Sequence, residues 1–414
     1  MGNSGFEPPT IPKWFDKNEK IYLFSPIFYF LMMKRIASIL TIFGTVLSSL
    51  YGQVDSPALY NDAAIFKEDS SKLLFSFYNL NFLKNNEYFG KIATGYTLFG
   101  SQLNPKIAWV PNAHMRIEGG IYIRKDFGNP SFTTIAPTLT FKLQNNGYAF
   151  LFGNLEGSVS HRLIEPLYNY ERLITNRLEN GLQFKVDKKA LWFDSWIDWE
   201  RQEYQNSPFQ EIITAGLSSK LTLLEASKTN FFSVKIPFQA IVSHHGGQID
   251  IDTTALQTLA NTATGISMEL DMSEKNGFLK SISSDNYYVY YRDLSPSKRQ
   301  PYISGNGTYL NLLLKSRPGI NLMISYWNGN YFMAPRGGYL YQSLTSLPWQ
   351  NGYTKDNRKL LIVRLMYQKE IYPGLLADVR LEPYEDVNNH FVEYSYSVYL
   401  SYKIDAPFRK TKTQ

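Results

Sequence analysis

The chain has 414 residues, no cysteine and a formal net charge of +6, and 15% of its residues are aromatic. The absence of cysteine excludes disulfides, thiol catalysis and cysteine-ligated metal sites. Beyond the N-terminal region no apolar run is long enough for a spanning helix, which argues against a helical membrane protein. The positive charge is spread along the chain, so we expect no nucleic-acid partner.

The N-terminal region contains a secretory signal. Residues 33–52, "MKRIASILTIFGTVLSSLYG", place two basic residues before a short apolar run and small residues after it. We therefore expect a signal peptide at 33–52, with a single membrane anchor as the alternative. Residues 1–32 precede the signal and are interpreted as an extension upstream of the true translation start. Residues 53–70 then form an N-terminal segment in the periplasm.

From residue 70 onwards nearly every segment reads as extended, rich in Tyr, Phe, Ile, Val and Thr and interrupted by Gly, Asn, Asp and Pro. "KIAWV" either continues the second strand or forms a separate one, because Pro105 and Pro111 flank it. We expect sixteen strands, approximately at 73–84, 89–104, 114–125, 132–143, 148–157, 179–186, 190–201, 209–222, 230–243, 257–272, 280–293, 306–316, 319–328, 357–369, 374–382 and 390–404.

Several of these strands have one apolar and one charged face, because successive side chains of a strand point to opposite sides. The last one, "HFVEYSYSVYLSYKI", alternates aromatic or aliphatic residues with Ser, Glu and Lys. Charges on the second face need water or partners, since burying them alone costs several kcal/mol each. The candidates for a water-filled lumen are Arg116, Glu118, Arg124, Lys142, Asp194, Asp198, Arg364, Asp378, Arg380, Glu382 and Glu393. Ion pairing among them is the alternative to direct contact with a solute.

The links between strands alternate in length. Short ones such as "PNA", "QNNG", "RPG" and "YPG" have the residues of tight hairpin turns. Those between them are longer, as at 158–178 and 329–356. Short turns on one side and long loops on the other are typical of bacterial outer-membrane barrels. We therefore predict an all-β fold, a single transmembrane antiparallel up-and-down β-barrel over residues 71–404. Sixteen strands fit best, within 14–18, and a soluble β-sandwich is the alternative.

No catalytic or metal-binding motif stands out. The histidines, at 114, 161, 244, 245 and 390, are scattered, and no nucleophile elbow or HExxH pattern occurs. His244 and His245 precede Asp250 and Asp252, but adjacent strand residues point in opposite directions, which disfavours a shared metal. The sequence therefore predicts no metal and no cofactor.

Two long loops have distinctive compositions. The loop at 158–178 has apolar spacing compatible with a short helix that plugs or caps the barrel, and its arginines could instead hold lipopolysaccharide phosphates or face solvent. The loop at 329–356 combines aromatic residues with an arginine, a set that can contact a small solute and narrow a barrel. Its candidate solute contacts are Tyr331, Phe332, Arg336, Tyr339, Tyr341 and Trp349. Packing of these aromatics against the rim is the alternative.

Through its signal peptide, its link pattern and the closing run "YSYSVYLSYKI", the chain resembles porin-like outer-membrane β-barrels of Gram-negative bacteria over about residues 70–404. The resemblance implies a bacterial outer-membrane location, with membrane lipid, lipopolysaccharide and the barrel insertion machinery as partners. Such barrels often end on an aromatic residue, whereas "DAPFRKTKTQ" follows here, and residues 405–414 are expected as a periplasmic tail.

The expected function is a passive or solute-selective channel with 329–356 as its constriction. The alternative is a closed barrel that acts as a surface receptor or as a partner of a secretion or polysaccharide-export complex. A lipid-modifying enzyme is a third possibility, but no nucleophile and base can be assigned to it. The protein is therefore predicted not to be an enzyme.

Overall fold

The computed structural model describes residues 56–156, 160–227, 230–275 and 277–408. They belong to one compact unit, Tyr51–Gln414. The expected extension at 1–32 and the signal peptide at 33–52 lie outside the described residues. Among the residues described, no helix is long and apolar enough to cross a membrane.

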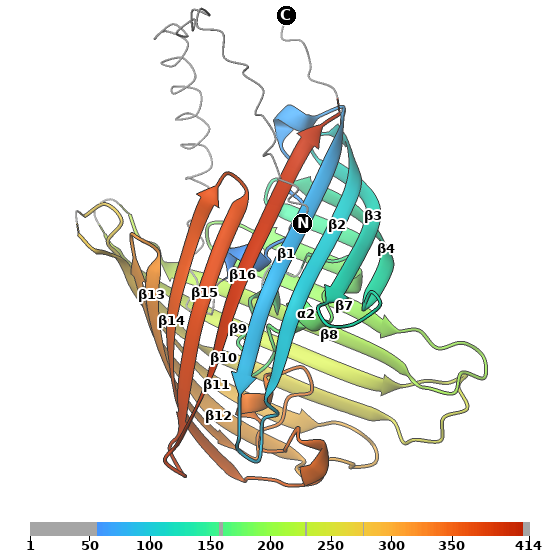
Figure 1. Cartoon of the computed structure of the whole chain (residues 1–414), viewed down its shortest axis with the longest axis vertical. Coiled ribbons are helices and arrows are strands. Elements are labelled where there is room, and N and C mark those ends of the chain that lie inside the picture. The colour runs from blue at the N-terminus through green and yellow to red at the C-terminus, as the bar shows by residue number, and fades with distance from the viewer. Residues whose placement is uncertain (1–55, 157–159, 228–229, 276, 409–414) are drawn as a thin grey trace, which may run out of the picture. The chain divides into compact units, whose positions relative to one another are not determined.

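Sixteen antiparallel strands close into one barrel, in which each strand pairs with its neighbours in sequence and β1 pairs with β16 (Figure 1). The predicted fold class and strand number are confirmed. The strands are β1 (Lys72–Glu87), β2 (Tyr96–Asn112), β3 (Met115–Asp126), β4 (Thr134–Asn145), β5 (Tyr148–Asn154), β6 (Asn180–Asp187), β7 (Leu191–Arg201), β8 (Glu211–Leu224), β9 (Phe232–Gly246), β10 (Gln257–Asp271), β11 (Leu279–Asp293), β12 (Ser304–Ser316), β13 (Ile320–Asn330), β14 (Asn357–Tyr372), β15 (Leu375–Asp386) and β16 (Phe391–Pro407).

Helical segments in the described residues are short and lie in the links. They are the 3-10 turns η1 (Pro57–Leu59), η2 (Lys67–Asp69), η3 (Ser160–Arg162), η4 (Tyr339–Tyr341) and η5 (Pro348–Gln350), and the single α-helical turn α2 (Arg172–Thr175). Strand β2 runs without a break through both Pro105 and Pro111, so "KIAWV" continues the strand.

The two faces of the strands are separated as the alternation in sequence predicts. In β16, Val398 on the outer face is 43% exposed, whereas Ser397 and Tyr399 on the inner face are fully buried. The exposed side chains of the other strands are likewise mainly aromatic or aliphatic. The outer surface therefore suits hydrocarbon, and the polar residues face the interior.

The two ends of the barrel differ. Strand β1 begins and β16 ends at the same end, which also carries the short turns (Figure 1). Bacterial barrels place such turns in the periplasm and the long loops outside the cell. The loop that follows β5, residues 155–179, is called L3, and the loop that follows β13, residues 331–356, is called L7.

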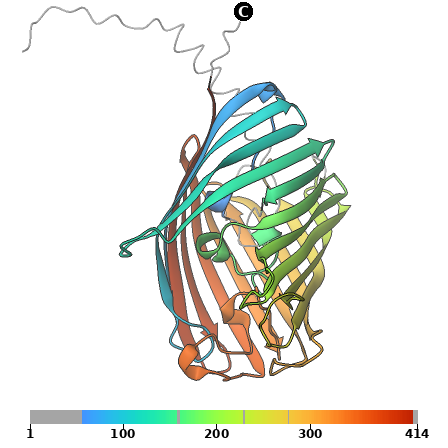
Figure 2. The same cartoon turned by 90° about the vertical axis from the view of Figure 1, so that its right-hand side faces the viewer.

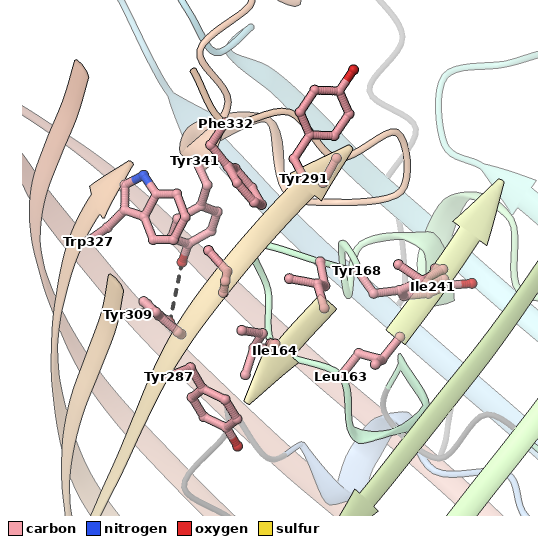
Figure 3. Close-up of a cluster of buried hydrophobic side chains, with 14 of the residues drawn as sticks. Leu163, Ile164, Tyr168, Ile241, Tyr287, Tyr291, Tyr309, Trp327, Phe332 and Tyr341 are labelled. Carbon is pink, nitrogen blue, oxygen red and sulfur yellow. Dashed lines mark hydrogen bonds between the residues drawn. The ribbon is translucent and has the colours of Figure 1, made fainter. Parts of the chain in front are cut away.

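Both loops fold into the barrel and fill it (Figure 2). Leu163, Ile164 and Tyr168 of L3 join Phe332 and Tyr341 of L7 in one buried apolar cluster with inward-facing residues of β7 and β9 to β15 (Figure 3). A second cluster packs Tyr170 and Ile174 of L3 against the wall and against residues of η1.

Residues 56–66, which the sequence analysis assigns to a periplasmic segment, contact the inner wall. Ala58 and Leu59 are buried, and Tyr78 of β1 donates a hydrogen bond to the carbonyl of Ala58 at 3.0 Å. Lys142 of β4 donates to the carbonyl of Ala63 at 2.6 Å. The N-terminal segment thus contributes to filling the interior at the short-turn end.

The outward position of Val398 gives a test of the membrane-facing surface. An arginine near the bilayer midplane costs roughly 2–4 kcal/mol. We expect Val398→Arg to lower the fraction of chain that migrates as folded, heat-modifiable barrel on gels of outer-membrane fractions, while Val398→Leu folds as the wild type does. Equal folding of both variants would contradict the assigned face.

Candidate functional site

All eleven charged residues predicted to line a lumen lie on the inner face and are buried. Arg116 contacts Glu118 at 2.9 Å and Asp405 at 3.0 Å, and Arg124 contacts Asp126 at 2.8 Å. Two other members of the set form ion pairs with glutamates of L3: Lys142 contacts Glu156 at 2.8 Å, and Arg364 contacts Glu165 at 2.5 Å. These charges therefore pair with each other and with L3, and they do not border an open channel.

The remaining members of the set also have partners: Asp194 contacts His161 of L3 at 3.0 Å, and Asp198 accepts a hydrogen bond from the backbone of Asn180 at 2.7 Å. Asp378 accepts from Ser56 and contacts Arg380 at 3.3 Å. Glu382 contacts Lys84 at 3.1 Å, and Glu393 accepts from the backbone of Gly90 at 2.6 Å.

The six candidate solute contacts in L7 are divided between two environments. Phe332 and Tyr341 are buried in the apolar cluster, where their ring centroids lie 5.0 Å and 5.5 Å from that of Trp327. Arg336 points to the wall and contacts Glu200 of β7 at 2.6 Å. Tyr331, Tyr339 and Trp349 are exposed, Trp349 to 74%. Solute contact by this loop stays a prediction.

One buried serine lies beside a lysine. Ser395 Oγ of β16 is 3.0 Å from Lys84 Nζ of β1, at the edge of a cavity of about 50 Å³ between L3, L7 and the wall. The same ammonium lies 3.1 Å from Glu382 and 3.7 Å from Glu171. Two carboxylates favour the charged ammonium, which cannot accept the proton of the serine. The pair is therefore a poor nucleophile–base couple.

The strongest acid–base group is centred on His161 in L3. Its Nε2 lies 2.7 Å from Glu179 Oε2, and its Nδ1 lies 3.0 Å from Asp194 Oδ2 of β7. The imidazole is 0% exposed and stacks on Trp196, with centroids 3.6 Å apart and planes inclined by 5°. Tyr168 of L3 donates a hydrogen bond to the second oxygen of Glu179. Two segments of L3 and strand β7 thus converge on one imidazole.

The charge state of His161 follows from its neighbours. Burial disfavours the imidazolium, but Glu179 and Asp194 outweigh burial and raise the pKa of His161 to about 10. At neutral pH the ring is therefore protonated, and both N–H groups donate to carboxylates.

The backbone at this histidine is in an unusual conformation. Ser160, His161 and Arg162 have φ values of 51°, 51° and 59°, in the left-handed region that few residues other than glycine adopt. Each such residue costs on the order of 1–3 kcal/mol, and such strain clusters at functional sites. The hydroxyl of Ser160 is also buried without a hydrogen-bond partner within the described part of the chain. The turn is held by the contacts of its side chains, His161 above all.

Glu179 connects this group to a second cavity of about 60 Å³. The cavity is bounded by β2, β3 and β4 on the wall side, by the start and end of L3, and by residues 61–63. Lys106 and Arg177 are the cationic residues among its walls, and Glu118, Glu156 and Glu179 are the glutamates. Glu118 and Glu156 are occupied by lysine partners, at 2.8 Å for Glu156 and Lys142. Glu179 is the carboxylate that joins the cavity to a histidine.

His161 was expected in a loop that plugs or caps the barrel, without a chemical role, and Glu179, Tyr168 and Trp196 were not expected at a site. The partners of His161 are 18 and 33 residues away in sequence, on different elements. The sequence signal for this site was a single histidine in a loop that also contains three arginines.

A closed barrel of sixteen strands, with an apolar outer surface and a polar interior, defines an integral β-barrel protein of the bacterial outer membrane. The model of a family described as lipid A 3'-O-deacylase-type matches residues 65–411, and the chain belongs to this family. Recognition of the chain by the barrel insertion machinery stays a prediction.

Solved structures with a similar fold include outer-membrane porin-like proteins. OprD from Pseudomonas aeruginosa is 11% identical, with a TM-score of 0.46, and the match covers 85% of this chain and 98% of that chain. A loop-deleted OmpT from Vibrio cholerae is 11% identical, with a TM-score of 0.48, and covers 80% of this chain and 100% of that one. No protein of curated function matches the sequence.

The family membership corrects two predictions. The expected porin-like channel with a constriction at 329–356 is wrong, and so is the expectation that the protein is not an enzyme, because the family is one of outer-membrane hydrolases that act on lipid A. The physical reason is that alternating strands specify a polar interior but not whether water or protein fills it. Here L3, L7 and the N-terminal segment fill it.

The filled interior predicts that the protein does not conduct ions. We expect purified protein in planar bilayers to show no stepwise conductance at any voltage that the bilayer withstands, since the cavities at L3 hold only about 50 and about 60 Å³. Regular conductance steps that scale with salt concentration would contradict the closed interior.

The raised pKa of His161 gives a pH test. The stabilisation from its imidazolium is complete below about pH 6.5, the value of a free histidine, and it is lost as the pH rises towards about 10. Urea unfolding of the folded barrel should therefore show wild type more stable than His161→Gln near neutral pH, with the difference shrinking at alkaline pH. A difference that grows with pH would contradict the assigned charge.

Proposed function

We propose that the protein hydrolyses an ester-linked acyl chain of lipid A in the outer leaflet of the outer membrane. Membership of the lipid A 3'-O-deacylase-type family supports the reaction class, and the family description names the 3'-O-linked chain. Within this chain, the observation that carries the proposal is the His161–Glu179 pair, 2.7 Å apart, beside a small polar cavity in the barrel wall.

Ester hydrolysis requires two proton transfers. A base must take a proton from the attacking water, and an acid must give one to the departing sugar oxygen. Glu179 borders the cavity, whereas His161 lies behind it, fully buried. The carboxylate is therefore placed to meet water, and the imidazolium is placed to hold the carboxylate in position through the hydrogen bond that joins them.

The proton balance then closes within the pair. The water oxygen bonds to the acyl carbon while Glu179 takes its proton, and the bond from the acyl carbon to the sugar oxygen breaks as Glu179 gives that proton to the sugar oxygen. Glu179 is then a carboxylate again, 2.7 Å from the imidazolium of His161, and the starting state is restored. The products are a free fatty acid and a sugar hydroxyl.

Asp194 and Trp196 position the imidazole and do not border the cavity. Asp194 receives a second hydrogen bond, from Gln183 Nε2 at 2.8 Å, which fixes its carboxylate towards His161 Nδ1. Stacking on Trp196 fixes the plane of the ring. Such supports restrict the imidazole to one orientation, which proton transfer between fixed partners requires.

The test is mass spectrometry of lipid A from a Gram-negative host whose own lipid A is fully acylated. We expect wild-type expression to remove one ester-linked acyl chain. Loss of an acid–base group typically costs 10²–10⁴-fold in rate, so Glu179→Gln should lower deacylation by about 100-fold or more. His161→Gln removes the partner that positions Glu179 and should lower deacylation as well.

The matched control is His390→Gln, since His390 is an exposed histidine in the link between β15 and β16, with its side chain 83% exposed. This variant should deacylate like the wild type. Fully acylated lipid A with wild-type protein folded in the membrane would refute the proposal, and undiminished activity of folded His161→Gln would refute the assigned residues.

A further inference from the structure

The wall of the barrel is incomplete beside L3. Strand β5 has seven residues and β6 has eight, between a β4 of 12 and a β7 of 11. Strand β4 pairs with β5 only over Thr140–Asn145, so Thr134–Thr138 has no β5 partner over roughly 17 Å of strand. On the other side β6 pairs with β7 only as far as Asp198. Towards the long-loop end, beyond Asn154 of β5 and Asn180 of β6, a gap therefore separates β4 from β7 (Figure 2).

The sequence of β4 is adapted to this open edge. The amide of Leu139 donates to Asn154 at 2.7 Å, so the odd-numbered residues of β4 direct their backbone groups towards β5. Pro137 is therefore on the same side and has no N–H to leave unpaired. A proline at an unpaired strand edge avoids an unsatisfied donor, which lipid would make costly.

The end of β5 is fixed as well. Gly153 has a φ of 101°, and a Cβ there would collide with the carbonyl oxygen of Leu139. Two residues after Gly153, the amide of Leu155 donates a hydrogen bond to the carbonyl of Glu179 at 2.9 Å. At this point the chain leaves the wall and turns inward as L3. The short length of β5 and β6 and the inward turn of L3 therefore occur at the same place in the wall.

Both rims of the gap carry apolar side chains on the outer surface. Ile135 and Leu139 project from β4, and Trp199 projects from β7. Trp199 also donates its indole N–H to Glu211 at 3.0 Å, the arrangement of a tryptophan with one apolar and one polar side that membrane interfaces favour. The rims therefore meet acyl chains, and the gap faces lipid.

The polar cavity reaches this gap. Thr138, Asn154 and Glu179 border both the gap and the cavity. With about 60 Å³, the cavity has room for a few polar atoms and not for an acyl chain. Access from the long-loop end is obstructed, because L3 and L7 are joined by backbone hydrogen bonds, from Asn169 to Arg336 at 2.6 Å and from Gly338 to Glu165 at 2.9 Å.

We propose that lipid A reaches Glu179 sideways from the outer leaflet, through the gap between β4 and β7. Its acyl chains stay outside, against Ile135, Leu139 and Trp199, and the ester and adjoining sugar oxygen enter the cavity. This inference rests on the proposed hydrolysis of lipid A and adds the route and the binding position.

The test uses the absence of cysteine from the chain. Thr138→Cys places a thiol at the gap, and Ser325→Cys, on the buried inner face of β13 where the wall is complete, is the matched control. Folded protein in outer membranes is treated with a maleimide on an alkyl chain that partitions into the bilayer, or with a sulfonated maleimide confined to water.

We expect the lipophilic reagent to label Thr138→Cys, to leave Ser325→Cys unlabelled, and to abolish deacylation in proportion to the label. The sulfonated reagent should label neither. Thr140→Cys, which lines the same cavity, replaces Thr138→Cys if that variant fails to fold. Leu312→Cys, on the outer face of β12, shows whether attaching an alkyl chain anywhere on the outer surface lowers activity. It should be labelled without loss of deacylation.

Labelling of Thr138→Cys by the sulfonated reagent alone would overturn the lateral route, and so would full lipophilic labelling with undiminished deacylation. Labelling does not depend on catalysis. If the wild type leaves lipid A intact, the proposed function fails, whereas a failed route shows itself in the labelling pattern while wild-type deacylation persists.

Discussion

The structure depends on one constraint: the charges on the inner face of a wide barrel must be paired where bulk water is scarce. Sixteen strands enclose more space than wall side chains fill. Two loops and the N-terminal segment occupy that space and supply partners, such as Glu156 to Lys142 and Glu165 to Arg364. At the fully buried His161, two carboxylates and one imidazolium join L3 to β7.

Filling the interior from L3 has a consequence for the wall. The chain that enters the barrel between Leu155 and Glu179 is no longer available to extend β5 and β6 to the height of their neighbours. The place where L3 turns inward is therefore also the place where β4 and β7 lack a paired strand between them, and Glu179 lies there. One feature of the topology thus brings acid–base groups and a lipid-facing opening together, which a lipid A hydrolase requires.

Much of the fold could be predicted from sequence because its signals are local. Alternation in "HFVEYSYSVYLSYKI" gives the two faces of β16, and the parity of short and long links gives the even strand number. The fifth strand was expected to reach residue 157, but β5 ends at Asn154, because its neighbours in space and not its own sequence decide where the chain turns inward.

The site was not predictable in the same way. An alternating strand has the same pattern whether its polar face meets water or a folded loop. The charges that were assigned to a channel are in fact buried, and most of them have charged partners in L3 or in the wall. The sequence predicts the beginning of a strand at Glu179. Its hydrogen bond with His161 forms only once L3 has folded back onto β7. Tertiary contacts across 18 and 33 residues carry no periodicity that sequence could reveal.

The most direct measurement is an experimental structure of the Glu179→Gln variant in nanodiscs that contain lipid A, since this variant should bind the substrate without cleaving it. The account predicts lipid A in the gap between β4 and β7, with acyl chains against Ile135 and Leu139 and an ester group beside position 179. Lipid A bound instead at the long-loop end near Trp349, or a gap occupied by protein with the cavity closed to the bilayer, would contradict it.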